Sequence, residues 1–273
     1  MKTPSSLRVG ILATGLMVLA SSVYAQGKVV VSHDEWFTGN GYLGSYGDQR
    51  FMGNTLNWFG LQSSNNVLVQ TTAYSGFYNG FYQGSALDTY LTGLGLNVTY
   101  SATATNYSAY NAVLISGDAN AGAYNGLANY VFGGGNVFVE GGTGAWSDGT
   151  LEATANNIFL NALGLTFTSP WNGIGPIDVS TAQFDQQGPF GAALFTGVNS
   201  VYANNGNSVV LTVSPVSGVT SQVWADGESG QGVFGAAEVA VTPEPATLLL
   251  FGTGLGLTGL GVIRRRRRNK IEQ

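Results

Sequence analysis

The sequence contains no cysteine and only one histidine, His33. The lack of cysteine excludes disulfides, thiol nucleophiles and thiolate metal sites, so an exported form of the chain must take its stability from core burial. The single histidine excludes metal sites built from several histidines. No Gly-x-Ser-x-Gly nucleophile elbow and no phosphate-binding loop with its lysine occurs. We therefore predict no catalytic residue.

Basic residues are almost absent from the central part of the chain. Between residues 26 and 241 only Lys28 and Arg50 are basic, against thirteen acidic residues, which gives this range a formal net charge of −11. A body of this charge repels nucleic acids and anionic lipid surfaces. We expect no nucleic-acid partner, and an acidic polysaccharide would be bound only through bridging cations or uncharged contacts.

The other basic residues flank apolar segments at the two ends of the chain. At the amino end, Lys2 and Arg8 flank the apolar run 9–20, and small residues then lead to Ala25. This pattern is typical of a signal peptide over residues 1–25, with signal peptidase cleaving between Ala25 and Gln26. A retained anchor helix is the alternative, although the run is shorter than the roughly 20 residues that a membrane span needs.

At the carboxyl end, residues 246–263 carry no charge and are followed by a basic end over 264–270. As a helix these 18 residues would be about 27 Å long, close to the hydrocarbon thickness of a bilayer. The basic end favours the cytoplasmic side, which places residues 26–245 outside the inner membrane. We therefore predict a transmembrane helix that anchors an exported body facing the periplasm.

Pro243, Glu244 and Pro245 stand directly before this predicted helix. The tripeptide, the Gly- and Leu-rich helix and the terminal arginines together resemble the PEP-CTERM sorting signal of Gram-negative bacteria over residues 242–273. The resemblance implies processing near the tripeptide by an exosortase, an integral-membrane enzyme, and a final place at the cell surface or outside the cell. Proteins of this kind commonly accompany exopolysaccharide production and biofilm growth. An ordinary membrane anchor would explain the helix and the arginines but not the tripeptide.

Short apolar runs alternate with amphipathic stretches in the first part of the body. The runs predict strands at 28–32, 67–70, 96–100, 112–116 and 136–140. The stretches predict helices at 48–61, 85–94, 121–132 and 147–163, the last one capped by Ser147. Continuous apolar strands between amphipathic helices favour an α/β domain over residues 26–165, with a doubly wound, mainly parallel sheet.

The composition changes after Pro170, where Gly, Asn and Ser become frequent. Short strands are predicted near 208–213, 221–225 and 232–241. We expect residues 166–241 to form a β-rich extension of the same domain, packed at an edge of the sheet.

Four stretches of the body resemble class I glutamine amidotransferase-like domains. They are residues 28–36, 54–58, 112–118 and 127–143. The resemblance implies a flavodoxin-like fold over roughly residues 28–165. Catalytic members of the family carry a cysteine on the turn after the strand that matches 136–140, whereas this turn reads Gly-Gly-Thr-Gly, and the family's triad histidine has no counterpart. The resemblance therefore implies the fold without amidotransferase activity.

Ligands of parallel α/β sheets bind at the carboxyl ends of the strands. The titratable residues expected at those ends are His33, Asp34, Glu35, Asp118 and Glu140. Clustered carboxylates repel one another unless a cation lies between them. One hypothesis is that Asp34, Glu35, Asp118 and Glu140 hold calcium through oxygen ligands and bridge to a sugar. The alternative is that each residue caps a helix or hydrogen-bonds a loop, and that His33 has a structural role rather than that of a general base.

Aromatic residues are frequent in or near the Gly-, Asn- and Ser-rich loops. They are Trp36, Tyr42, Tyr46, Tyr74, Phe77, Tyr78, Phe81 and Tyr82. Exposed rings beside neutral hydrogen-bonding groups can stack on sugars, although such rings can equally close over the sheet as loop anchors. We interpret the body as a non-enzymatic module that binds polysaccharide, directly or through cations. The alternatives are a diverged hydrolase-like or amidotransferase-like enzyme at the corner formed by His33, Asp34 and Glu35, and a purely structural coat component.

Overall fold

The computed structural model describes residues 26–45, 47–71, 80–116, 121–142, 148–173, 177–178, 188–202, 204–226 and 229–240. The predicted signal peptide and the predicted sorting tail lie outside the described residues. The contacts divide the chain into two units, and all the described residues belong to the unit that spans 25–240. Within the described ranges, no helix combines the length and the apolar character that a membrane crossing requires.

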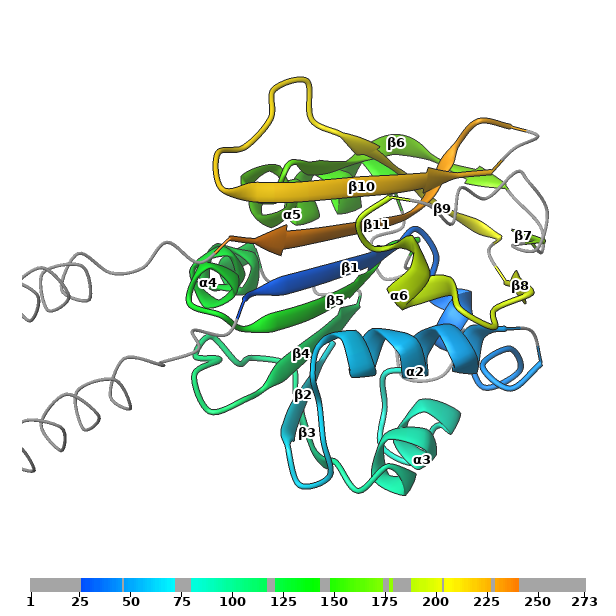
Figure 1. The fold of residues 1–273 in the computed structure, drawn as a ribbon, viewed down its shortest axis with the longest axis vertical. Helices are drawn as coiled ribbons and strands as arrows, with labels where there is room; N and C mark the ends of the chain where they lie inside the picture. The colour runs from blue at the N-terminus through cyan, green and yellow to red at the C-terminus, as the bar shows by residue number, and fades with distance from the viewer. Residues whose placement is uncertain are drawn as a thin grey trace, which may run out of the picture. The chain divides into compact units, whose positions relative to one another are not determined.

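A seven-stranded sheet forms the centre of this unit (Figure 1), in the order β10-β11-β1-β5-β4-β2-β3. The strands are β1 (Lys28–Ser32), β2 (Asn66–Gln70), β3 (Asn97–Ser101), β4 (Ala112–Ser116), β5 (Asn136–Glu140), β10 (Val219–Ala225) and β11 (Gly232–Val239). Strands β1 to β5 are parallel to one another, and β10 and β11 form an antiparallel hairpin that extends the sheet beyond β1, with β11 antiparallel to β1. The prediction of a mainly parallel α/β sheet is confirmed.

The order of the parallel strands does not confirm the flavodoxin-like expectation. Numbered along the chain, these strands run 3-2-4-5-1 across the sheet, whereas a flavodoxin-like sheet runs 2-1-3-4-5. The first strand therefore lies at the end of the parallel set, beside β5. The C-terminal hairpin then covers the edge of β1, which would otherwise be unpaired.

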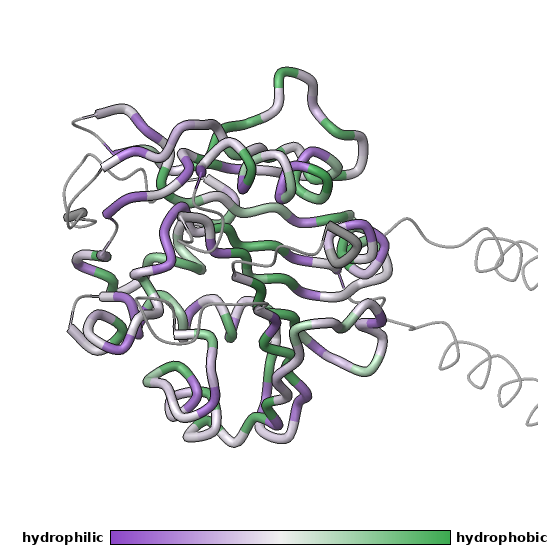
Figure 2. The backbone as a smooth tube through the Cα atoms, turned by 180° about the vertical axis from the view of Figure 1, so that it is seen from behind, coloured by the Kyte–Doolittle hydropathy of each residue, from purple (hydrophilic) through white to green (hydrophobic). Residues whose placement is uncertain are grey.

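Helices cover both faces of the sheet, as a doubly wound arrangement requires. They are α2 (Asp48–Trp58), α3 (Ala86–Gly93), α4 (Ala121–Phe132), α5 (Gly149–Leu160) and α6 (Gly191–Phe195). Successive strand residues point to opposite faces, so Val30 packs with α2, α3 and α6 while Val29 and Val31 pack with α4 and α5. Burial on both faces explains why the strands are continuously apolar, and Figure 2 shows hydrophobic residues concentrated along the sheet.

A second, smaller β-layer follows α5. A 3-10 turn, η3 (Asn161–Leu163), leads into β6 (Leu165–Gly173), which pairs antiparallel with β9 (Asn205–Leu211). Two short strands, β7 (Ile177–Asp178) and β8 (Ser200–Val201), pair with each other. The predicted C-terminal strands are thus present as β9, β10 and β11. Strand β6 was not predicted, because Ser169 and Pro170 interrupt its apolar pattern.

Two helices differ from their predicted bounds by more than one residue at an end, and one of them, α5, ends at Leu160 rather than at residue 163. Helix α2 ends at Trp58 rather than at residue 61. Helix α5 begins at Gly149, and its N-cap is Asp148, whose carboxylate accepts a 2.7 Å hydrogen bond from the amide of Thr150. Ser147, the predicted cap, lies outside the described residues. Asp and Ser are both good caps, so their order in the sequence could not decide between them.

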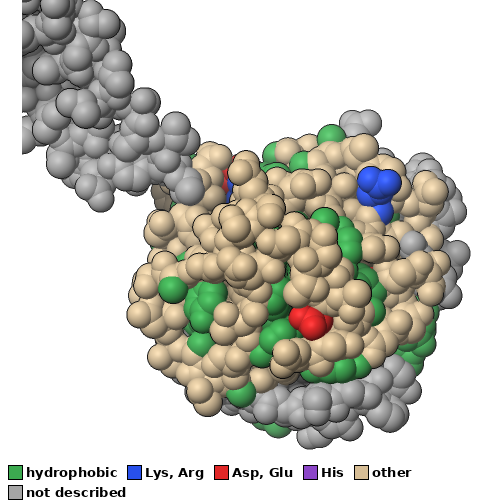
Figure 3. All heavy atoms as spheres, turned by 90° about the horizontal axis from the view of Figure 1, so that it is seen from below, with side chains coloured by type: hydrophobic (Ala, Val, Ile, Leu, Met, Phe, Trp, Pro, Cys, Tyr) green, Lys and Arg blue, Asp and Glu red, His purple; other side chains and the backbone are tan. Residues whose placement is uncertain are grey.

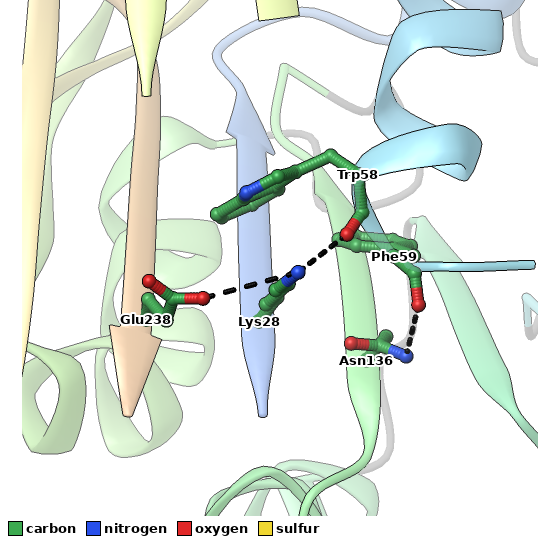
Figure 4. Close-up of polar contacts among 5 residues, drawn as sticks. All are labelled: Lys28, Trp58, Phe59, Asn136 and Glu238. Atoms are coloured by element: carbon green, nitrogen blue, oxygen red, sulfur yellow. Dashed lines mark hydrogen bonds and ion pairs between the residues drawn. The ribbon is translucent and has the colours of Figure 1, made fainter. Parts of the chain in front are cut away.

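Lys28, one of the two basic residues of the body, has a structural role at the amino end of β1 (Figure 4). Its ammonium group donates a 2.6 Å hydrogen bond to the carbonyl of Trp58 and lies 3.8 Å from the carboxylate of Glu238. On the neighbouring strand, the amide of Asn136 donates to the carbonyl of Phe59 at 3.2 Å. These contacts fix the end of α2 against the edge of the sheet that lies opposite the predicted site.

Candidate functional site

The structure brings three of the predicted carboxylates together at the carboxyl edge of the sheet. Ser32 of β1 is the register partner of Glu140 in β5. His33 and Asp34 follow β1 directly, and Glu35 begins the 3-10 helix η1 (Glu35–Thr38). Burial raises the pKa of Glu140 well above its usual value, and the charges of Glu35 and Asp34 add to this rise. Asp118, the remaining predicted carboxylate, lies outside the described residues.

These predicted site residues are buried. The exposed fraction is 0% for His33 and Asp34, 3% for Glu35 and 1% for Glu140. The amide of His33 donates to the carbonyl of Val233 in β11 at 3.0 Å. On the other side, a Cβ atom added to Gly206 in β9 would lie 1.6 Å from the carbonyl oxygen of His33, so only glycine allows β9 to pass this close. Strands β11 and β9 therefore cover the carboxyl end of β1.

Asp34 uses its carboxylate to hold backbone. Its Oδ1 accepts a 3.1 Å hydrogen bond from the amide of Trp36, which caps η1. Its Oδ2 accepts from the amide of Asn204 and, at 3.3 Å, from the amide of Asn205. Asp34 thus joins the end of β1 to the segment that enters β9. The described contacts of Asp34 are those of a residue that anchors a loop, and not those of a ligand site.

Asp48, which was not among the predicted site residues, holds the same segment. It is the first residue of α2 and is 0% exposed. Its Oδ1 accepts a 2.8 Å hydrogen bond from the amide of Tyr202, and the neighbouring Gly47 amide donates to the carbonyl of Ser200 at 2.6 Å. We call Asp34 and Asp48 the carboxylate clamp. In the sequence, Asp48 has only the appearance of an ordinary first-turn helix residue.

Burial shifts the pKa values of the clamp upward. The pKa of Asp34 rises to about 6 because burial disfavours its charged form more than its backbone hydrogen bonds favour it. The pKa of Asp48 rises to about 8 for the same reason, and the charge of Asp34 adds to the effect. Both carboxyl groups therefore bind protons more tightly in the folded chain than in the unfolded chain.

His33 is poorly placed to act as a general base. Burial lowers its pKa to about 3, so the ring is neutral at physiological pH. Neither ring nitrogen has a hydrogen-bond partner among the described residues. A catalytic histidine is normally oriented by a hydrogen bond from one nitrogen and reaches its substrate with the other.

The described residues do not supply a metal site. Within them, no group of three or more His, Cys, Asp or Glu side chains is arranged to hold an ion. Both oxygens of Asp34 already accept backbone hydrogen bonds. The calcium hypothesis therefore gains no support from the described carboxylates.

Three aromatic rings stack beside the clamp. The ring centroids of Tyr42 and Tyr202 are 4.2 Å apart, and Trp36 lies 5.7 Å from Tyr202. All three residues are half-buried, so the rings pack largely against one another. Phe81 lies in the loop before α3 and belongs to the core with 1% exposure, which agrees with the loop-anchor alternative. Tyr46, Tyr74, Phe77 and Tyr78 lie outside the described residues.

A hollow of about 460 Å³ lies between β6 and the turn of the β10–β11 hairpin. None of the described residues that line it is charged, and its polar and aromatic lining includes Thr168, Ser169, Trp171, Asn172, Ser208 and Gln231. We call this hollow the β6 groove. Sequence reasoning missed it because its lining comes from three distant segments, one of which is the unpredicted strand β6.

Comparison with known proteins does not assign the chain to a family. No protein-family model matches it, and no curated protein matches it. Its function must therefore be inferred from its residues and their geometry.

Stability against unfolding should fall as the pH rises from about 4.5 to 8. Unfolded carboxyl groups release their protons near pH 4, whereas folded Asp34, Asp48 and Glu140 keep theirs to higher pH, so stability is lost as the pH passes their folded pKa values. His33 acts in the opposite sense between about pH 3 and 6.5, because its folded pKa is lowered. Three carboxyl groups outweigh one imidazole, and each unmatched proton changes stability by about 1.4 kcal/mol per pH unit.

Urea unfolding at pH 5, 6.5 and 8 measures this slope. Asp48→Asn keeps an acceptor for the amide of Tyr202 but cannot ionise, so the loss of stability between pH 6.5 and 8 should shrink by up to about 1.4 kcal/mol per pH unit. The exposed cap variant Asp148→Asn serves as the matched control and should leave the slope unchanged. A stability that is constant or rises over this range would contradict burial of the clamp.

Proposed function

We propose that this chain is an exported protein of the cell envelope or extracellular matrix, and that its body binds polysaccharide without catalysing a reaction. The observation that carries the non-enzymatic part is the burial of His33, Asp34 and Glu35, with exposed fractions of 0 to 3%. Both carboxylate oxygens of Asp34 accept hydrogen bonds from backbone amides. A substrate arriving from solvent meets none of these groups directly.

The proposed location outside the inner membrane follows from the two ends of the sequence. Signal peptidase would cut between Ala25 and Gln26, and an exosortase would act near the tripeptide 243–245. The limits of the fold support this scheme, because β1 begins at Lys28 and β11 ends at Val239. The strands and helices that the structure describes therefore all lie between the two proposed cutting sites. Removal of either end would leave the sheet whole.

The surface suits an uncharged partner. Residues 26–241 contain only two basic residues, and Lys28 is engaged with Trp58 and Glu238. Figure 3 shows one face of the molecule on which acidic and basic side chains are few and uncharged atoms predominate. A polymer of neutral sugars needs hydrogen bonds and aromatic contacts rather than charge. This supports polysaccharide over nucleic acid as the partner.

The enzyme alternative would place a hydrolase-like or amidotransferase-like reaction at the corner formed by His33, Asp34 and Glu35. Such a site needs an accessible, hydrogen-bonded pair of titratable groups. Burial of all three residues weighs against it. The amidotransferase-like resemblance enters our proposal only as a shared layering of helices on a parallel sheet, because the strand order differs from the flavodoxin-like one.

The proposed export and sorting predict two processing events in the producing bacterium. The mature protein should begin at Gln26 and should lack the basic end over 264–270. Replacement of all three residues 243–245 by alanine should keep the basic end on the chain and hold the protein in the membrane fraction. Intact mass after cell fractionation measures both outcomes, and Pro215→Ala in the body is the control. Recovery of the uncut 28.4 kDa chain from the cytosol would contradict export.

The proposed binding role predicts that the full-length chain co-sediments with insoluble exopolysaccharide from the producing cells. Binding should be saturable and should persist at high salt, because a body with so few basic residues cannot rely on charge attraction. No soluble sugar fragments should appear during the incubation. Failure to co-sediment would contradict the binding role, and release of reducing ends above a protein-free control would favour the enzyme alternative.

A further inference from the structure

One wall of the β6 groove is a rigid irregularity in β6. The pairing between β6 and β9 shifts register between Phe167 and Trp171, so residues 168–170 leave the ladder. The indole nitrogen of Trp171 donates a 2.8 Å hydrogen bond to the buried carboxylate of Glu152. A Cβ atom added to Gly149 would lie 2.7 Å from the Trp171 ring, so the ring packs tightly onto the start of α5. This wall is fixed in place before any ligand arrives.

The opposite wall is the turn of the β10–β11 hairpin. The amide of Asp226 donates to the carbonyl of Gln231 at 2.7 Å, and the side chain of Asp226 accepts from the amide of Ser229 at 2.8 Å. A Cβ atom added to Gly232 would lie 1.8 Å from the carbonyl oxygen of Val209. The hairpin therefore packs backbone against backbone on β9. Because residues 230 and 232 are glycines, Gln231 is the described turn residue that brings a side chain to the groove.

A chain of hydrogen bonds joins the two walls. The amide nitrogen of Asn172 donates to the hydroxyl of Ser208 at 2.5 Å, and this hydroxyl donates to Oε1 of Gln231 at 3.1 Å. Oδ1 of Asn172 is buried and has no partner among the described residues, and the Gln231 amide nitrogen donates to none of them. The chain thus leaves the side-chain nitrogen of Gln231 without a protein partner beside the groove, whereas Oδ1 of Asn172 is sealed from solvent.

This arrangement matches the chemistry of sugars. Each sugar hydroxyl both donates and accepts, so neighbouring hydroxyls can bond to an amide oxygen and an amide nitrogen at once. An amide nitrogen that has no protein partner at a groove is available to a ligand hydroxyl. The groove volume of about 460 Å³ lies within the range of about 300 to 1,000 Å³ that is typical of small-ligand sites. The lining contains no basic residue that would favour an acidic sugar.

We propose that the β6 groove binds neutral sugar units of a polysaccharide, with the side-chain amide of Gln231 bonding the hydroxyl groups. This inference rests on the proposed binding function and assigns it a site and a class of ligand. The competing occupants are acidic sugars and an extended peptide bound along β6.

Isothermal titration calorimetry of the full-length chain tests the proposal. The chain is kept in a detergent without a sugar headgroup, since such headgroups would compete for the groove. The probes are three neutral hexasaccharides (cellohexaose, maltohexaose and laminarihexaose), a hexamer of galacturonic acid, and an uncharged hexapeptide of Gly and Ser. We expect at least one neutral hexasaccharide to bind, and the galacturonate hexamer to bind at least tenfold more weakly.

Three variants locate the binding site. Gln231→Ala removes one hydrogen-bonding side chain and should weaken binding about five- to tenfold. Val210→Trp places a large ring on an exposed β9 position that lines the groove, and it should abolish binding. Gln62→Ala makes the same chemical change as Gln231→Ala at an exposed loop position outside the groove, and should leave the affinity unchanged. Thermal unfolding of each variant checks that the fold is intact.

The outcomes separate the groove from the proposed function. If the chain binds neutral sugars but both groove variants bind like the wild type, the groove assignment is wrong and the binding function stands. If no neutral hexasaccharide binds while the chain still co-sediments with exopolysaccharide, the groove assignment again fails alone. Binding of neither oligosaccharide nor exopolysaccharide overturns both proposals. Stronger binding of the acidic hexamer or of the peptide overturns the neutral-sugar class.

Discussion

The body depends on how the segment before β9 is held against the end of β1. Buried backbone amides need acceptors, and Asp34 and Asp48 supply them to residues 202, 204 and 205. Gly206 then allows β9 to pass close to the carbonyl of His33. Because β9 pairs with β6 and packs against the hairpin, the carboxylate clamp positions the whole second layer. The same burial raises the pKa of both clamp residues, which makes the arrangement sensitive to pH.

The residues that hold the fold and the groove proposed to bind sugar lie in different places. In many parallel α/β proteins the polar carboxyl edge of the sheet binds the ligand. Here the described groups at that edge are buried, and Asp34 and Asp48 serve the fold. The β6 groove, part of whose lining comes from β9, provides uncharged amide and hydroxyl groups instead. An anionic body with a neutral groove fits a role in binding neutral polymer outside the cell.

The sequence predicted correctly those strands that are buried on both faces, because their apolar runs are continuous. The strands 28–32, 112–116 and 136–140 have the bounds that their continuous apolar runs predicted, because both faces of each strand are covered. The gathering of Asp34 with Glu140 followed from the geometry of a parallel sheet. The contacts of Asp34 agree with the alternative that it caps a helix or hydrogen-bonds a loop. Its partners Asn204 and Asn205 could not be named from the sequence, since they lie about 170 residues away along the chain. Strand β6, the strand order and the groove likewise depend on distant contacts that no local pattern encodes.

The state of His33 tests most directly whether this corner is buried structure or an accessible site. His33 is the only histidine in the chain, so a protein without a histidine tag gives a single imidazole C2 proton signal in an NMR spectrum. We expect this signal to keep the chemical shift of a neutral imidazole from pH 5 to 8, because burial lowers the pKa of His33 to about 3. A signal that titrates near pH 6.5, the ordinary value, would show a solvated corner and would contradict the clamp.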